Sequence, residues 1–197
     1  MNVVVVVEDQ LSAAVMQRLL AHVDRGFVIN RLLVKRGIGN IRREMHIYRN
    51  ASHVLPHIVV ADLDALPCPV QARDEWKLTH LPARLMVRFA VRETEAWLLA
   101  DKPGLAGFLQ VPQTKLPSRP EAESDPKRCL VNLARTSKSR RLVAQLVPAQ
   151  GSSVPIGPRY NELLEDFVRI HWDVDRAADG APSLARMLMR LRTFPVS

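Results

Sequence analysis

Apolar residues in the first half of the chain fall into short blocks separated by polar ones. Residues 3–7 are a continuous run of valines, which is typical of a strand buried on both faces of a parallel sheet. Apolar residues then recur at helical spacing over about 11–24, which predicts an amphipathic helix. Residues 28–34 have the composition of a second strand, and a turn at 37–40 precedes an Arg-rich segment, 40–52, that we expect to be helical.

Two more apolar blocks follow before the middle of the chain. Residues 58–61 and 84–91 are predicted to be strands, and 93–101 a short helix that Pro103 and Gly104 end. This order of strands and helices predicts an α/β fold with a parallel or mostly parallel sheet flanked by helices.

The second half of the chain has a different texture. Prolines make 111–124 a loop or a mobile flap, and Asp125 with Pro126 forms a typical helix start. Helical patterns then cover 126–136, 139–147, 158–172 and 182–192. We therefore expect an α/β core over residues 1–110, with a mainly helical extension, 111–197, that packs on the same domain.

Composition limits the class of protein. The chain has 197 residues, 47% hydrophobic and 24% charged, which fits one globular domain and argues against disorder and coiled coil. Its apolar runs are too short to cross a bilayer, and no basic segment precedes the first strand, so neither a membrane span nor a signal peptide is expected. Two cysteines cannot build a disulfide framework, and a cytoplasmic location is the simplest expectation.

The charge balance is basic. Lys and Arg number 28 against 20 Asp and Glu, for a net charge of +8, which indicates either a polyanionic partner such as nucleic acid or only a solubilising surface. Segment 31–49 has six basic residues against one acid, and 115–141 has eight against three. Both can bind a phosphate backbone or can simply be solvated helix faces. The candidates for phosphate binding are Arg36, Arg42, Arg43, Lys127 and, at a helix start after Gly157, Arg159.

Acidic residues follow three of the predicted strands. Glu8 follows the first, Asp62 and Asp64 follow another, and Glu93 and Glu95 follow a third. Because ligands of an open parallel sheet bind outside the carboxyl ends of its strands, we expect these five carboxylates to converge. Their mutual repulsion favours one or two Mg²⁺ or Mn²⁺ ions, which prefer oxygen ligands. Taken singly, each acid is also typical of a turn or of the first turn of a helix.

A strand-Glu-helix unit followed by a strand-Asp-x-Asp unit resembles the Toprim domain of topoisomerases, primases and related nucleases. The resemblance covers about residues 3–101 and implies a Rossmann-like sheet. It also implies that Glu8, Asp62 and Asp64 hold divalent metal and act on phosphodiester bonds. The turn after Glu8 departs from the family, because it has Asp9 and Gln10 where the family often has Gly.

Segment 92–101, with the sequence RETEAWLLAD, is similar to a signature of small stand-alone bacterial Toprim-like proteins. It also resembles the second metal-site strand of the overcoming-lysogenisation-defect type nucleases. That resemblance implies that Glu93 and Glu95 help to hold a second metal, and that Lys127 lies near the scissile phosphate. No ATPase domain is attached, so any control by ATP requires a separate ATPase or another protein partner.

These observations predict a metal-dependent phosphodiesterase or nuclease acting on DNA or RNA by two-metal hydrolysis, with Glu8, Asp62, Asp64 and Lys127 as catalytic residues. The two tyrosines, Tyr48 and Tyr160, are not beside the acids in the sequence, which disfavours covalent topoisomerase chemistry. The resemblance further implies a role in defence against foreign DNA or in repair.

Two other classes stay open. One is a non-catalytic subunit that binds nucleic acid or docks a partner, and the other is a small-molecule phosphotransfer or nucleotide-hydrolysing enzyme. A homodimer is also left open by the sequence.

Overall fold

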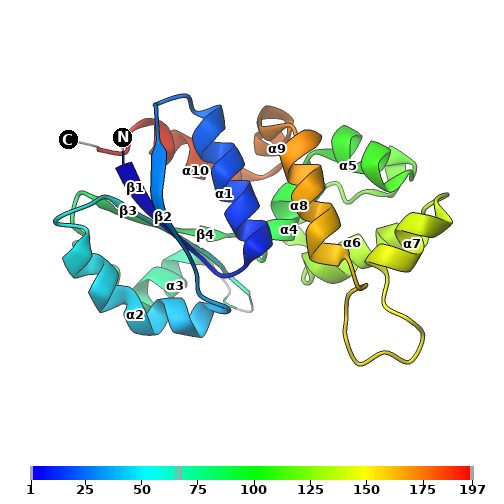
Figure 1. The fold of residues 1–197 in the computed structure, drawn as a ribbon, viewed down its shortest axis with the longest axis horizontal. Coiled ribbons are helices and arrows are strands. Elements are labelled where there is room, and N and C mark those ends of the chain that lie inside the picture. Colours follow the sequence, from blue (N-terminus) through cyan, green and yellow to red (C-terminus); the bar gives the residue numbers. More distant parts are fainter. Residues whose placement is uncertain (1, 65, 67, 196–197) are drawn as a thin grey trace.

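The computed structural model describes residues 2–64, 66 and 68–195. Its centre is a sheet of four strands in the order β2-β1-β3-β4, and all pairs of neighbouring strands are parallel (Figure 1). The predicted α/β class with a parallel sheet is therefore confirmed. The strands are β1 (Asn2–Val7), β2 (Val28–Val34), β3 (His57–Asp62) and β4 (Leu85–Ala90).

Helices cover both faces of the sheet, as the uninterrupted run of valines in β1 predicts. Alternate side chains of a strand point to opposite faces, so Val3, Val5 and Val7 enter the core under α1 (Gln10–His22). Val4 and Val6 enter the second core, beneath α2 (Ile38–Ala51) and α3 (Pro69–Glu75). Figure 1 shows α2 and α3 on the side of the sheet opposite α1.

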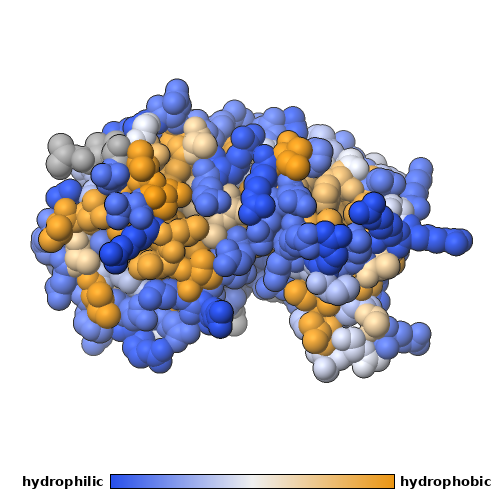
Figure 2. Space-filling model, viewed as in Figure 1, coloured by the Kyte–Doolittle hydropathy of each residue, from blue (hydrophilic) through white to orange (hydrophobic). Residues whose placement is uncertain are grey.

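The two outer strands differ from the central pair. β2 is an edge strand, and its Val28 is 54% exposed. Figure 2, which has the same view as Figure 1, shows a hydrophobic patch on the half of the molecule that contains the sheet. β4 is the other edge strand, and α10 (Pro182–Arg192) packs beside it.

The helical second half shares a core with the sheet. α8 packs on α1, and α9 packs on α4, so buried residues of the C-terminal helices and of β1 belong to one cluster. Within the described part of the chain, no helix is both long and apolar enough for a bilayer. The remaining helices are α4 (Thr94–Ala100), α5 (Lys102–Leu109), α6 (Pro126–Arg135), α7 (Arg140–Leu146), α8 (Tyr160–Ile170) and α9 (Val174–Gly180), with short 3-10 turns at Gln113–Lys115 and Pro120–Ala122.

The pair Pro103-Gly104 ends α4 as expected, but it does not begin a loop. α4 ends at Ala100, and α5 begins at Lys102 with Pro103 in its first turn. Pro is tolerated there because the first N–H groups of a helix have no intrahelical acceptor. The helices α3 and α9 were not predicted either, since α3 buries only Ala72 and α9 only Val174 and Ala177, which is too few apolar positions to show a helical period.

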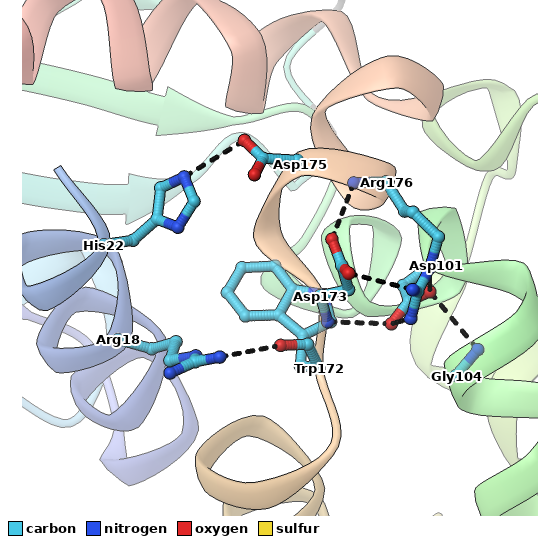
Figure 3. Close-up of polar contacts among 8 residues, drawn as sticks. All are labelled: Arg18, His22, Asp101, Gly104, Trp172, Asp173, Asp175 and Arg176. Atoms are coloured by element: carbon cyan, nitrogen blue, oxygen red, sulfur yellow. Dashed lines mark hydrogen bonds and ion pairs between the residues drawn. The ribbon is translucent and has the colours of Figure 1, made fainter.

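Asp101 joins the two halves of the chain. Its carboxylate is fully buried and accepts hydrogen bonds from the backbone N of Asp173 and from Arg176 Nε, both at 2.9 Å (Figure 3). It also accepts from Gly104 N at 3.2 Å, at the start of α5. The same carboxylate therefore fixes the corner between α4 and α5 and the start of α9.

Candidate metal centre

The candidate site lies where the sheet topology changes direction. From β1 the chain goes to β2 on one side and, after β2, to β3 on the other, so the carboxyl ends of β1 and β3 border the usual ligand crevice of such sheets. Glu8 directly follows β1, and Asp62 ends β3. Glu8 Oε1 accepts a hydrogen bond from the backbone N of Asp62 at 2.8 Å. The structure thus brings together two acids that are far apart in the sequence.

Thr94, which follows β4, donates hydrogen bonds to Asp62 and so links the third strand end to the site. Asp62 Oδ1 accepts from the backbone N of Thr94 at 3.0 Å and from its hydroxyl at 2.9 Å. The Thr94 hydroxyl in turn lies 3.2 Å from the hydroxyl of Ser12, in the first turns of α1. Within the part of the chain that the structure describes, both hydrogen bonds to the Asp62 carboxylate fall on Oδ1, which leaves Oδ2 for a further ligand.

Glu93 and Glu95 flank Thr94 and meet Lys127, at the start of α6. Lys127 Nζ lies 3.8 Å from Glu93 Oε1 and 3.6 Å from Glu95 Oε1. The backbone N of Lys127 also donates to Glu93 Oε2 at 2.9 Å. Asp125 caps this helix by accepting from Arg128 N at 2.7 Å, and Pro126 occupies its first turn, as the sequence predicts. This helix start therefore places Lys127 at the acids.

Asp64 occupies the rim of the site. Its backbone has a φ of 49°, and its N–H donates to the carbonyl of Arg92 at 2.8 Å. The Arg92 guanidinium donates to the Asp64 carbonyl at 3.2 Å, so the loops after β3 and β4 are joined. The Asp64 side chain is exposed, and its charge acts on Glu8.

Burial and mutual repulsion disfavour the charged form of the inner carboxylates. Burial, opposed by the hydrogen bond from Asp62 N and assisted by the charge of Asp64, raises the pKa of Glu8 to about 7. Burial also raises the pKa of Glu95 to about 7, although Lys127 opposes the shift. For Asp62, burial and the charges of Glu95 and Glu8 raise the pKa well above its usual value.

The negative potential of the carboxylates raises the pKa of both Lys127 and Tyr160. Burial lowers the pKa of Lys127, but the charges of Glu95 and Glu93 raise it more, so the ammonium is retained. Tyr160 is buried, and its hydroxyl donates to Glu95 Oε1 at 3.2 Å. Burial and the charge of Glu95 raise the pKa of Tyr160 well above its usual value, so it stays a neutral phenol.

Three residues of this site were missed by sequence reasoning. Tyr160 is distant from the acids in the sequence, but it comes from α8 and reaches Glu95 in the folded chain. Ser12 and Thr94 were also missed as parts of the hydrogen-bond network. Only Thr94 had a sequence signal, its place between two acids at a strand end; tertiary packing alone brings in the others.

The predicted phosphate-binding arginines are distributed differently from the acids. The backbone N of Arg36 donates to the Glu8 carbonyl at 2.7 Å, so its exposed side chain starts at the site. Arg42 instead pairs with Glu75 of α3, and Arg43 donates to Asn40 within α2. Among the described residues, the Arg159 guanidinium pairs with Glu162 and with none of the five acids.

A groove begins at Lys127 and leads away from the acids. It has a volume of about 600 Å³ and runs between α6 and the loop that joins α7 to α8. We call it the α6 groove; it is lined by Glu93, Asp125, Lys127, Arg128, Val131, Asn132, Arg135, Pro148, Ser152, Val154 and Pro155. One wall thus carries three cations of α6, and the other carries small and apolar side chains.

The donor set fits a hard divalent cation in its chemistry. All five candidate ligands are carboxylates, and three of them are held in the charged form only against burial and repulsion, which a cation would offset. Within the described ranges, no group of three or more His, Cys, Asp or Glu side chains is already arranged as a metal-binding cluster. The observed hydrogen bonds to Asp62, Glu93 and Glu95 come from protein donors instead.

Comparison of the chain with protein-family models, with curated proteins and with solved structures gives no match.

Proposed function

We propose that the protein is a metal-dependent phosphodiesterase that acts on nucleic acid, DNA or RNA, with one or two Mg²⁺ or Mn²⁺ ions held by Glu8, Asp62, Asp64, Glu93 and Glu95. The observation that carries the proposal is the position of Lys127, whose Nζ lies 3.6 Å from Glu95 and 3.8 Å from Glu93. A cation at an oxygen-rich site is the arrangement that phosphoryl transfer requires, because negative charge must be stabilised on the reacting phosphate.

Each residue has a distinct task in this proposal. Bound divalent ions would polarise the phosphodiester and supply hydroxide from water near neutral pH. Asp62 is oriented by its two hydrogen bonds from Thr94, so its free oxygen is aimed without rotamer freedom. Lys127 would donate to a non-bridging phosphate oxygen, and neutral Tyr160 would hold Glu95 in place. The reaction is hydrolysis, since a buried phenol with a raised pKa is a poor nucleophile.

The α6 groove supports a polymeric substrate. Lys127, Arg128 and Arg135 lie along one helix at its wall, and the groove is continuous with the acids through Glu93. Phosphates of a strand bound there would meet a row of cations and end at Lys127. This favours nucleic acid over a free nucleotide, which would not need the length of the groove.

A second candidate is a non-catalytic nucleic-acid-binding subunit. The observation that favours it is that Lys127 already partly neutralises Glu93 and Glu95, while hydrogen bonds from Thr94 and Tyr160 occupy one oxygen each of Asp62 and Glu95. In that case the same groove would bind nucleic acid without any metal.

Cleavage assays separate the two candidates. Wild-type protein, Asp62→Asn and the control Asp74→Asn are incubated with plasmid, single-stranded DNA and single-stranded RNA in the presence of Mn²⁺ or Mg²⁺. Asp74 is an exposed acid on α3, outside the site. The enzyme proposal expects cleavage by wild type and Asp74→Asn, and a loss of at least 100-fold in Asp62→Asn. Equal activity in all three proteins, or none in any with binding retained, rejects the enzyme and selects the second candidate.

The cysteines bear on the compartment in which the protein works. Both Cys68 and Cys129 are free thiols, which fits a reducing compartment, so we propose a cytoplasmic protein. A role in defence or repair, and a partner ATPase, follow only from the resemblance to Toprim nucleases.

A further inference from the structure

Four arginines lie close together at β4, an edge strand of the sheet. Arg88 lies in the edge strand β4, Arg73 comes from α3, and Arg186 and Arg190 are one turn apart on α10. The charges of the other three act on Arg88. Like charges placed this close destabilise the fold unless a counter-charge is present, so the cluster calls for an explanation.

Two small cavities adjoin this cluster. One has a volume of about 300 Å³ and the other of about 210 Å³, and Arg73, Val87, Arg88 and Arg190 line both. Arg186 lines the larger, together with the apolar residues Pro69, Phe89 and Met189. No acidic side chain occurs among the described residues that line either cavity. We call the two cavities together the β4 arginine pocket.

Arg88 has an unmet hydrogen bond in this pocket. Its Nε is buried and has no hydrogen-bond partner within the described part of the chain. A buried donor on a charged group that lacks an acceptor is costly, and such atoms in native proteins usually have a water, an ion or a function. Burial, and then the charges of Arg190, Arg73 and Arg186, lower the pKa of Arg88 to about 10.

We propose that the β4 arginine pocket binds a phosphate group, carried either by a small phosphorylated molecule or by a nucleic-acid backbone. Guanidinium groups recognise phosphate through paired N–H donors, and Arg73, Arg88 and Arg190 can approach one anion from three elements. The apolar side chains beside them suit the organic part of a phosphate ester. A volume of about 300 Å³ limits that part to roughly the size of a mononucleotide.

The pocket is separate from the candidate metal centre. None of its lining residues is one of the five acids or Lys127. It extends along β4 from Phe89 back to Leu85, toward the amino ends of the strands, whereas the acids lie at the carboxyl ends. The proposal therefore stands or falls independently of the proposed phosphodiesterase.

Calorimetry with simple anions tests the pocket. Inorganic phosphate, pyrophosphate and adenosine monophosphate are titrated into wild type, Arg190→Gln and the control Arg192→Gln, without divalent metal. Arg192 is exposed on the same helix and lines neither cavity, so both variants lose one charge from α10. We expect at least one of the anions to bind wild type and Arg192→Gln equally and to bind Arg190→Gln at least 10-fold more weakly. No binding by wild type at millimolar concentrations, or equal weakening in both variants, overturns the proposal.

Competition and melting complete the test. If a single-stranded oligonucleotide displaces the bound anion, the pocket binds a phosphate of a nucleic-acid backbone. If only the mononucleotide displaces it, the pocket binds a small phosphorylated molecule. Either result supports a phosphate site. In melting experiments Arg190→Gln should be at least as stable as wild type without anion, because repulsion is relieved. It should also lose the rise in melting temperature that phosphate gives to wild type. A rise as large in Arg190→Gln as in wild type contradicts the assignment.

Discussion

The inner carboxylates are held in a state that is unfavourable without a counter-charge. Glu95 is only 2% exposed, and Lys127 Nζ lies 3.6 Å from Glu95 Oε1. Glu8 faces the charges of Asp64 and Asp9 and has a hydrogen bond from Asp62 N as its main compensation. Strongly shifted carboxylates that share one crevice are more typical of functional sites than of structural ion pairs. This strain is the residue-level reason to expect a cation here.

The raised pKa values of Glu8 and Glu95 make stability depend on pH. Both groups bind protons more tightly in the folded chain, where the pKa is about 7, than in the unfolded chain, where it is 4.5. Their contribution is fully present below pH 4.5 and is lost as pH rises through about 7. We expect the metal-free protein to melt at a lower temperature at pH 8 than at pH 6, and Glu95→Gln to reduce this difference.

Adding a divalent metal provides the control for the pH dependence of the melting temperature. Mg²⁺ or Mn²⁺ at pH 8 should restore the melting temperature of wild type more than that of Glu95→Gln, since deprotonated ligands bind metal best. A melting temperature that is flat between pH 6 and pH 8 in wild type would contradict the burial argument.

Removing the Tyr160 hydroxyl distinguishes hydrolysis from covalent tyrosine chemistry. Tyr160→Phe removes only the hydroxyl that donates to Glu95, and we expect a loss of about 1 kcal/mol in the free energy of unfolding. Hydrolysis does not use this hydroxyl as a nucleophile, so any cleavage should fall by less than 10-fold. Loss of all cleavage, with a covalent adduct trapped on wild type, would instead indicate tyrosine chemistry.

At the scale of elements, much of the site could be predicted because strands and parallel topology leave clear signals. The valine run of β1 and the apolar run of β3 show where strands end, so Glu8 and Asp62 could be placed at one edge before any coordinates. The helix start at Asp125-Pro126 could also be predicted from the sequence, because capping residues act locally.

Other parts could not be predicted, because they depend on packing between helices of the two halves. Spacing does not show that Tyr160 reaches Glu95 over 65 positions, or that Arg159 pairs with Glu162. The helix α5 was not predicted, because Pro103 and Gly104 are helix breakers in the interior of a helix, whereas Pro is tolerated in its first turn.

The corner between α4 and α5 carries a stability prediction. Asp101→Ala removes the buried acceptor of Gly104 N, Asp173 N and Arg176, and we expect a loss of about 3 kcal/mol in the free energy of unfolding. Gly104→Ala should also destabilise, because an added Cβ would collide with the Asp101 carboxylate. Chemical denaturation measures both, and Asp173→Ala, which removes a helix cap, should cost only about 1 kcal/mol. Equal losses for Asp101→Ala and Asp173→Ala would show that Asp101 is not the joint.

For the whole molecule, the effect of the net charge of +8 on binding depends on where the basic side chains lie. Lys127, Arg128 and Arg135 line the α6 groove, which Glu93 also lines, whereas Arg42 pairs with Glu75 and Arg43 with Asn40. Nucleic-acid binding should therefore depend on the groove more than on the total charge.

The salt dependence of binding checks this. The double variant Arg128→Gln/Arg135→Gln should weaken oligonucleotide binding at least 10-fold and make the slope of log affinity against log salt shallower by one to two, roughly one per lost phosphate contact. Arg42→Gln/Arg43→Gln loses the same charge from α2 and should change both quantities much less. Fluorescence anisotropy over a salt series measures them, and an equal effect of the two double variants would mean that binding follows overall charge.

The central claim is that carboxylates from three strand ends bind divalent metal together, and Mn²⁺ binding measured by electron paramagnetic resonance tests it most directly. At pH 8 we predict one or two bound Mn²⁺ ions per chain in wild type and in Asp74→Asn, and a loss of at least 10-fold in affinity in both Glu8→Gln and Asp62→Asn. No bound Mn²⁺ in folded wild-type protein, or binding that neither Glu8→Gln nor Asp62→Asn changes, would contradict the account.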